Sequence, residues 1–136
     1  MTKKSKNYGD AHKTDWTLLF DDFPASMLDL SKPVYRHVMQ DELLEVVRWA
    51  FEQGVTFHDI LAAREYGVKK YERYNWKLSM GTGDHAAFLL KNKKSIYRHL
   101  MAYHDGEEID EESGCKHLAM VCLRCMIKVE YDQNQP

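Results

Sequence analysis

The sequence predicts an all-α fold, a compact helical domain of about four to five helices. Two segments, 41–53 and 115–129, repeat apolar residues at three- and four-residue intervals, which is typical of helices with a buried face. No run of β-branched residues alternates with polar residues, as a half-buried strand would require. The chain of 136 residues fits one domain, so we expect a flexible tail over 1–14 and a single helical domain over 15–136.

The first third of the chain contains one clear helix. Residues 1–14 are polar and rich in lysine, which indicates a mobile tail. Pro24 and Pro33 interrupt the irregular apolar residues of 16–34, so only short helical turns are expected there. The helix over 41–53 follows, and Gly54 lies where a helix can end. Its apolar stripe consists of Leu43, Val46, Val47, Ala50 and Phe51.

Thr56 and Asp59 match a capping box and predict the start of a second helix. The apolar face of this helix consists of Ile60, Leu61, Val68 and Tyr71. Gly67 lies on the same face, and glycine inside a helix costs roughly 1 kcal/mol relative to alanine. Its presence indicates either the close approach of another backbone or of a ligand, or simply a weak point in the helix.

The second half of the chain predicts a loop and three further helical segments. Residues 78–84 form the loop, 86–90 a short helix, and Ser95 is expected to cap the helix that carries His104. The last helix is apolar almost all round, so it lies at the centre of the fold or packs against a second subunit, and we expect a homo-oligomer. Its continuous stripe consists of Cys115, Leu118, Ala119, Cys122, Cys125, Met126 and Val129.

The three cysteines lie in this last predicted helix, so they do not form a disulfide framework. Cys122 and Cys125 form a CxxC, but no second cysteine pair completes a zinc site, and we expect free thiols that face the core. No apolar run approaches the roughly 18 residues of a membrane span, and no signal-peptide pattern follows the basic start. These observations favour a cytoplasmic protein without a membrane partner.

Charge is clustered although the net charge is only −2, a value that does not indicate binding to a nucleic acid polymer. Basic residues gather over 69–77 and 91–98, and six of the eight residues over 105–112 are acidic. Basic groups beside an acidic loop suit a small, phosphate-bearing ligand together with a divalent cation.

Three motifs in the second half occur in a distinctive order. They are Gly67-Val-Lys-Lys-Tyr71 leading to Asn75-Trp76, then Tyr97-Arg-His-Leu100, then Gly106-Glu-Glu-Ile-Asp110-Glu-Glu-Ser-Gly114 with His117-Leu-Ala119. In this order and spacing the sequence resembles the phage dATP/dGTP diphosphohydrolase (N-terminal domain) family. The resemblance covers about 60–131, whereas residues 1–55 match poorly.

The resemblance implies a function in purine nucleotide chemistry. It suggests a role like that of the all-α MazG-type pyrophosphohydrolases, which hydrolyse nucleoside triphosphates to monophosphate and pyrophosphate with Mg²⁺ or Mn²⁺. The expected substrate is a purine (deoxy)nucleotide, dGTP or dATP, in the host cytoplasm if the protein is phage-encoded. The family pattern has a second histidine where this chain has Met120. The alternatives are a non-catalytic phage protein that sequesters a nucleotide or a nucleotide-derived immune signal, and a purely structural protein.

The acidic loop supplies the metal-ligand candidates. We expect Glu107 and Asp110 to hold Mg²⁺ or Mn²⁺, because these ions prefer oxygen donors and the Glu-x-x-Asp spacing places both carboxylates on one side of a helical turn. Glu112 is a further metal candidate, and a solvated acidic loop is the structural alternative. Glu112 and Ser113 are equally well interpreted as capping groups.

Catalytic and substrate-binding candidates flank this loop. His99 and His117 lie on the two helices beside it and could meet across it to orient water or move a proton, with Glu107 as a third catalytic candidate. Structural histidines are the alternative for both. We expect the phosphates to bind Arg98 and Lys70, with Ser113 as a further contact. The base would contact Asn75 and Trp76, for which a turn and a core tryptophan are the alternative.

Overall fold

The computed structural model describes residues 13–23, 33–70 and 85–134. Six helices lie in these ranges, and the predicted all-α class is confirmed. One isolated bridge, between Ile109 and Lys116, is the only β pairing among the described residues. The helices are α2 (Thr17–Phe20), α4 (Pro33–Met39), α5 (Leu43–Glu52), α6 (Phe57–Lys70), α8 (His85–His104) and α9 (His117–Gln133).

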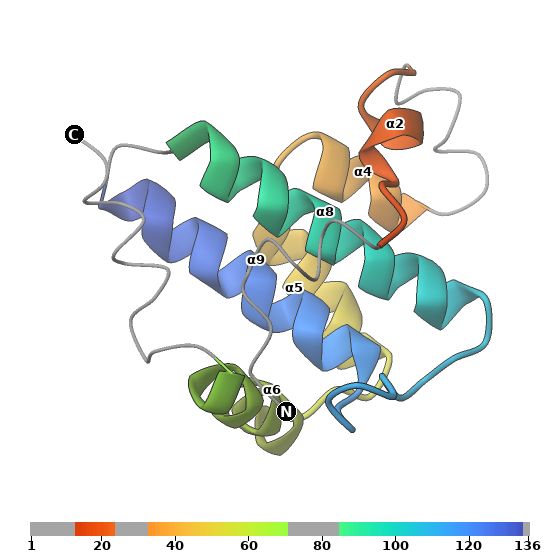
Figure 1. Cartoon of the computed structure of the whole chain (residues 1–136), viewed down its shortest axis with the longest axis vertical. Helices are drawn as coiled ribbons and strands as arrows, with labels where there is room; N and C mark the ends of the chain where they lie inside the picture. The colour runs from red at the N-terminus through yellow and green to blue at the C-terminus, as the bar shows by residue number, and fades with distance from the viewer. Residues whose placement is uncertain (1–12, 24–32, 71–84, 135–136) are drawn as a thin grey trace.

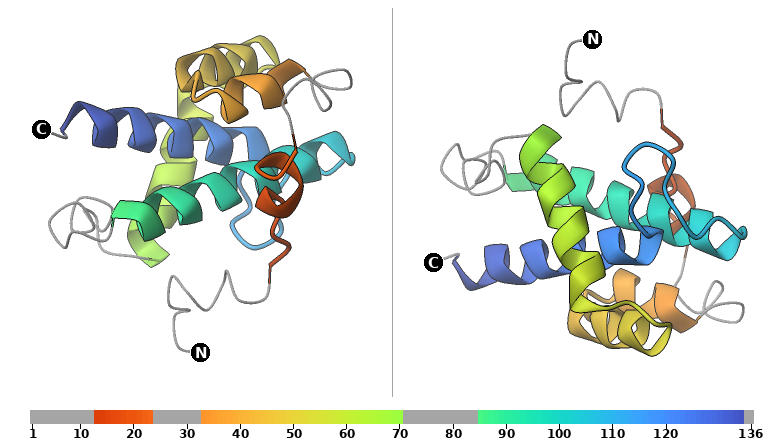
Figure 2. Two further views of the ribbon diagram at one scale, coloured as in Figure 1. Left: turned by 90° about the horizontal axis from the view of Figure 1, so that it is seen from above. Right: turned by 90° about the horizontal axis from the view of Figure 1, so that it is seen from below.

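Helix α9 lies at the centre of the described fold and packs against α5, α6 and α8. Helices α8 and α9 run side by side in opposite directions, and α6 crosses them (Figures 1 and 2). The apolar surface of α9 therefore faces neighbours within the chain, and its buried residues include Leu118, Ala119, Val121, Cys122 and Cys125. This packing explains the apolar sequence of α9 without a second subunit, and the homo-oligomer stays a prediction.

Helix α8 corrects the expected division into a short helix over 86–90 and a second helix capped by Ser95. The helix is continuous, and Ser95 is buried inside it instead of capping its start. No glycine or proline lies between His85 and His104, so nothing breaks the backbone hydrogen bonding of the polar 91–95 segment. Asn92 in this segment is buried against α9, where its Nδ2 donates to the backbone oxygen of Arg124 over 3.1 Å.

The N-terminal apolar residues form two short helices, as the sequence predicts, with Pro33 as the first residue of α4 instead of an interruption. A proline fits the first turn of a helix because that backbone nitrogen has no intrahelical partner. Phe20 of α2 stacks on Tyr35 of α4 and Tyr97 of α8, with ring centroids 4.7 and 4.5 Å apart. These rings join both short helices to the main bundle. Pro24 lies outside the described residues.

All three cysteines are free and buried, as the sequence predicts. Burial raises the pKa of the Cys122 thiol to about 12, and it raises the pKa of Cys125 as well. The two thiols of the CxxC therefore stay protonated at neutral pH and serve as core residues. Cys115 lies in the loop before α9, whereas the sequence predicted that it belongs to the last helix.

Helix α6 begins with the predicted capping box. The backbone N–H of Thr56 donates to Asp59 Oδ2 over 2.9 Å, and the backbone N–H of Asp59 donates to Thr56 Oγ1 over 3.2 Å. Lys116 Nζ lies 3.1 Å from Asp59 Oδ2 and connects this helix start to the residue before α9. The Thr56 backbone N–H, with Lys116, holds the pKa of Asp59 below its ordinary value of 3.8.

Replacing Asp59 by alanine is expected to lower the free energy of unfolding by about 1 kcal/mol at pH 7, because it removes the hydrogen bond from the Thr56 N–H and the ion pair with Lys116. Because the folded pKa of Asp59 lies below the unfolded value, its stabilisation is present above about pH 3.8 and is lost as the pH falls through the folded pKa. The difference between wild type and Asp59→Ala should therefore shrink in acid, which urea unfolding at a series of pH values measures. A difference that stays constant down to pH values below the folded pKa would contradict this account.

Gly67 of α6 would meet no described atom within 4 Å if it carried a Cβ. No close approach by the described part of the chain therefore explains this glycine. No helix of the described ranges has the length and apolar character to cross a membrane.

Candidate metal centre

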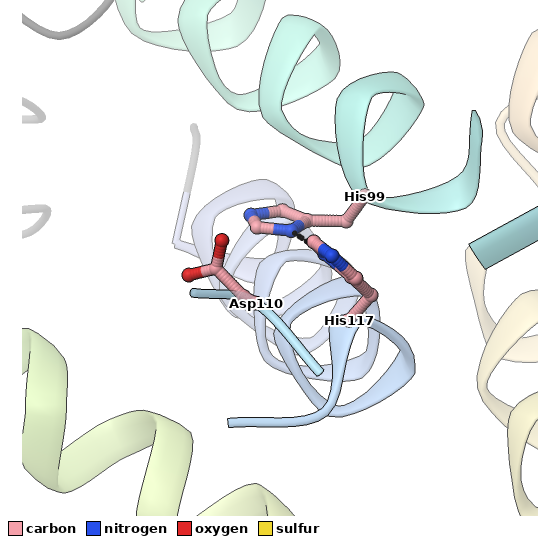
Figure 3. Close-up of side chains that lie close together, drawn as sticks. All are labelled: His99, Asp110 and His117. Carbon is pink, nitrogen blue, oxygen red and sulfur yellow. Dashed lines mark hydrogen bonds between the residues drawn. The ribbon is translucent and has the colours of Figure 1, made fainter. Parts of the chain in front are cut away.

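Two histidines meet where α8 ends and α9 begins. His99 lies in the last two turns of α8, and His117 is the first residue of α9. Because the two helices are antiparallel and are joined by the 105–116 loop, their imidazoles face each other with the Nδ1 atoms 2.8 Å apart (Figure 3). The expected meeting of the two rings across the loop is present in the structure.

Asp110 of the loop lies close to the two histidines. One ligand atom from each of His99, Asp110 and His117 lies within 4.8 Å of the other two. Two nitrogens bound to one ion at about 2.0–2.1 Å lie about 2.9–3.4 Å apart, close to the spacing of the two imidazoles. A small approach of the Asp110 carboxylate would complete a three-donor site. We call these three residues the His–His–Asp group.

The loop that carries Asp110 is not helical, which corrects the expectation of a helical turn with both predicted carboxylates on one side. It begins at Gly106, whose φ of +102° ends α8. The backbone N–H of Gly106 donates to Tyr103 O over 3.0 Å, and that of Glu107 donates to Ala102 O over 2.9 Å. This pair of hydrogen bonds is a Schellman motif, and it determines where Glu107 leaves the helix.

Replacing Gly106 by alanine is expected to lower the free energy of unfolding by about 1–3 kcal/mol, because residues with a Cβ rarely adopt a positive φ. The added methyl would meet no described atom, so the cost lies in the backbone conformation. Gly67→Ala is the matched control, because Gly67 lies inside a helix, and it should stabilise by about 0.5–1 kcal/mol. Urea unfolding measures both, and equal effects of the two substitutions would refute the argument.

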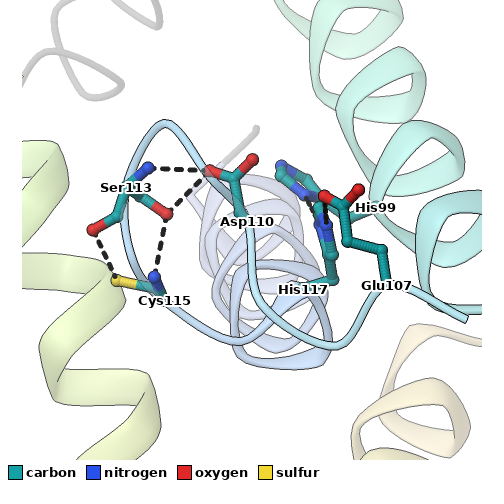
Figure 4. Close-up of polar contacts among 6 residues, drawn as sticks. All are labelled: His99, Glu107, Asp110, Ser113, Cys115 and His117. Carbon is teal, nitrogen blue, oxygen red and sulfur yellow. Dashed lines mark hydrogen bonds and ion pairs between the residues drawn. The ribbon is translucent and has the colours of Figure 1, made fainter.

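Ser113 holds the carboxylate of Asp110. The backbone N–H and the Oγ of Ser113 both donate to Asp110 Oδ2, over 3.0 and 2.7 Å. Ser113 Oγ in turn accepts the backbone N–H of Cys115 over 3.1 Å. Figure 4 shows this network on one side of Asp110 and the histidines on the other. Neither Glu112 nor Ser113 caps α9, whose N-cap is Lys116 without a side-chain hydrogen bond, so the capping interpretation is wrong.

Glu107 contacts the far side of the His117 ring. Its Oε1 lies 2.7 Å from His117 Nε2, and the Glu107 side chain is 50% exposed whereas that of His117 is only 5% exposed. An ionised carboxylate only accepts hydrogen bonds, so His117 Nε2–H donates to Glu107. In the neutral imidazole, His117 Nδ1 then carries a lone pair and accepts from His99 Nδ1–H.

The charges around His99 favour its neutral form. Burial lowers the pKa of His99 well below its ordinary value of 6.5, and the neighbouring His117, Arg98, Arg124 and Lys13 lower it further. Neutral imidazole is the form that binds a metal ion, and His99 would bind through Nδ1 once its proton moves from Nδ1 to Nε2. The same cationic residues would favour the approach of a negatively charged ligand.

The donors of the His–His–Asp group fit a divalent metal ion. Two imidazole nitrogens and one carboxylate oxygen suit first-row transition ions better than Mg²⁺, which prefers oxygen ligands throughout. Three protein donors with remaining open positions are also the arrangement found in catalytic metal sites. Among the described residues, this is the only group of three histidine, cysteine or acidic side chains close enough to share an ion.

The remaining predicted site residues have different positions. Arg98 is half-buried on α8 beside His99. Glu112 is exposed, its Oε2 lies 3.5 Å from Lys13 Nζ, and it is not among the side chains close enough to share an ion with the histidines. Lys70 ends α6, and its side chain lies outside the described part of the structure, as do Asn75 and Trp76. The sequence analysis predicted the two histidines as catalytic residues and not as metal ligands. The feature that could have indicated them as ligands is their position on both sides of an acidic loop.

An open cleft of about 660 Å³ is lined by residues of α5, α8 and the 105–116 loop. Trp49 of α5 and Tyr103 of α8 line it, together with Glu108 and Lys116 of the loop. The His–His–Asp group does not line this cleft, whereas the sequence neighbours of Glu108 and Lys116, namely Glu107 and His117, belong to the site described above.

The fold and the site define an all-α domain with a candidate His–His–Asp metal centre between its two longest described helices. A family model described as dATP/dGTP diphosphohydrolase, N-terminal, matches residues 3–136, and the chain belongs to this family. The match includes residues 3–55, so the expectation that residues 1–55 match the family poorly is wrong. Searches of curated proteins and of solved structures found no match to the chain. The family description supports a hydrolase that acts on dATP or dGTP.

Proposed function

We propose that the chain hydrolyses purine deoxynucleoside triphosphates, dGTP and dATP, to the monophosphate and pyrophosphate. The observation that carries this proposal is the His–His–Asp group, whose three donor atoms lie within 4.8 Å of one another in a member of this family. Water would add across the bond between the α-phosphorus and the oxygen that bridges to the β-phosphorus, and pyrophosphate would leave.

The residues of the site fall into two groups, one that would bind the metal ion and one that would bind the phosphates. His99, Asp110 and His117 would hold the divalent ion, which when bound acts as a Lewis acid toward a phosphate oxygen. Arg98 lies beside His99 and, with Arg124 and Lys13, places positive charge around it. This charge would attract the triphosphate and stabilise the negative charge that develops in the transition state. Lys70, Asn75 and Trp76 remain proposed contacts for the phosphates and the base.

The donor set favours Mn²⁺ over Mg²⁺ of the two ions expected from the sequence. Imidazole nitrogen is a poor ligand for Mg²⁺, which keeps its water shell and selects carboxylates and phosphates. Mn²⁺ accepts carboxylate oxygen and binds nitrogen more strongly than Mg²⁺ does. We therefore expect turnover to be faster with Mn²⁺ than with Mg²⁺ at equal concentration.

Met120 does not remove a donor from the proposed centre. This residue occupies the position of the second histidine in the family pattern, and here it is buried in the core with an exposed fraction of 9%. The His–His–Asp group already supplies three protein donors, as in other catalytic metal sites. Met120 is therefore compatible with turnover.

The test is an incubation of the metal-free protein with dGTP, dATP, GTP and ATP after addition of Mn²⁺ or Mg²⁺, with the products separated by chromatography. Monophosphate and pyrophosphate that form only when an ion is added would support the proposal and rank the bases. Nucleotides that stay intact under every condition would refute it. Intact nucleotide released from the denatured protein would then support the alternative, a phage protein that sequesters its ligand.

A further inference from the structure

We propose that Glu107 and Ser113 are positioning residues, which hold His117 and Asp110 ready for a metal ion without binding the ion themselves. This inference rests on the proposed function, because it takes His99, Asp110 and His117 as the ligands. It assigns to Glu107 a role different from the metal or proton-transfer role that its position in an acidic loop suggests.

The first part of the inference concerns the proton on His117. Glu107 Oε1 lies 2.7 Å from His117 Nε2, on the opposite edge of the ring from the Nδ1 that faces His99. The carboxylate holds the proton on Nε2, and this choice leaves the lone pair of Nδ1 directed into the His–His–Asp group. Without Glu107 the ring can place its proton on Nδ1, and this tautomer cannot bind an ion through that atom. A carboxylate on the outer nitrogen of a histidine ligand is a recurrent feature of metal sites.

The second part concerns the two oxygens of Asp110. The N–H and the hydroxyl of Ser113 both donate to Oδ2, at 3.0 and 2.7 Å. The Cys115 N–H donates to Ser113 Oγ over 3.1 Å and so favours the orientation in which the hydroxyl proton points to Asp110. With Oδ2 occupied in this way, Oδ1 is the oxygen available to an ion.

The location of Glu107 argues against a direct bond to the ion. Its side chain is half exposed, and its Oε1 already accepts a hydrogen bond from Nε2 of the buried His117 ring. Three donor atoms close enough to share an ion come from His99, Asp110 and His117, and Glu107 is absent from that set among the described residues. The acidic loop therefore contributes one ligand and, through Glu107, one support for a second ligand.

The first experiment measures the tautomer of His117 in the metal-free, full-length protein by long-range ¹H–¹⁵N NMR. In the wild type we expect the proton on Nε2 and none on Nδ1, and in Glu107→Ala a mixture of both tautomers. Glu107→Gln should retain the wild-type tautomer in part, because its amide oxygen still accepts a hydrogen bond. A proton on Nδ1 of His117 in the wild type would overturn the role given to Glu107.

The second experiment measures Mn²⁺ affinity by calorimetry and the visible absorption of bound Co²⁺. Glu107→Ala and Ser113→Ala should each weaken Mn²⁺ binding by about 10–100-fold, with an absorption spectrum that retains the wild-type coordination. Glu107→Gln should fall between wild type and Glu107→Ala. Glu111→Gln is the matched control, because it removes one charge from the same loop at an exposed position and should bind like the wild type.

The outcomes separate this inference from the proposed function. A wild type that binds neither Mn²⁺ nor Co²⁺ would overturn the metal centre, whereas the NMR result would still decide the tautomer. Wild-type binding together with variants that bind like Glu111→Gln would overturn only the positioning roles. A Co²⁺ spectrum of Glu107→Ala that shows a lost protein donor would make Glu107 a ligand. Thermal unfolding without metal identifies any variant that has lost affinity through misfolding.

Discussion

Replacing His117 by glutamine is expected to lower kcat/KM for dGTP by about 10²–10⁴-fold, because a bound metal ion contributes several kcal/mol to catalysis as a Lewis acid. His117 is the residue on which the site converges, because its Nδ1 faces His99 and its Nε2 contacts Glu107. The substitution removes one of the three proposed metal donors, so Mn²⁺ affinity should fall together with turnover. Steady-state kinetics at saturating Mn²⁺ and calorimetry measure the two effects.

Glutamine is the better substitution at this position because His117 is almost fully buried, and alanine would add the cost of a cavity. His58→Gln serves as the control, since it changes an exposed histidine of α6 and should leave both values unchanged. His99→Gln should reproduce the loss seen with His117→Gln. If both site variants retained wild-type kcat/KM and Mn²⁺ affinity, the His–His–Asp group would not be the active centre.

Replacing Leu100 by alanine is expected to lower the free energy of unfolding by about 2–5 kcal/mol. Leu100 lies on α8 with no exposed surface and belongs to the same core cluster as the buried face of α9. Deletion of its side chain removes apolar contacts and leaves a cavity that close-packed neighbours fill only in part. Urea unfolding, followed by circular dichroism, measures the change.

Leu90→Ala is the matched control on the same helix. Its side chain is 45% exposed, so the change in unfolding free energy should stay within about 0.5 kcal/mol. Equal losses at the two positions would show that α8 does not pack as the structure describes. A loss near 4 kcal/mol would approach the total stability of many small domains, so Leu100→Ala is best studied at low temperature.

The helices were predicted well where the sequence pattern involves residues close together in the chain. The capping box at Thr56 and Asp59 involves residues three positions apart, and the structure has it. The apolar repeat of α9 predicted a helix buried on most of its surface, and the structure confirms that burial. The division of α8 failed because its polar middle resembles a loop in isolation, whereas packing against α9 buries Asn92 and Ser95.

The family assignment also came from the sequence, through ordered motifs that include Arg98-His99 and Asp110. From the sequence, metal ligands could be predicted only by residue type and local spacing, and these pointed to the three acids Glu107, Asp110 and Glu112 of one loop. It could not show that Glu107 contacts the outer nitrogen of His117, or that Glu112 pairs with Lys13. These contacts depend on the path of a non-helical loop.

By itself, then, the sequence determined the all-α class, the apolar last helix, the buried thiols and the family, because periodicity and ordered motifs are properties of neighbouring residues. Only the tertiary structure decided which donors meet. His99 and His117 come from two antiparallel helices, and Asp110 comes from a loop that starts with a positive φ at Gly106. Their convergence depends on how α8 packs on α9, an interaction between residues distant in the chain that no local pattern encodes.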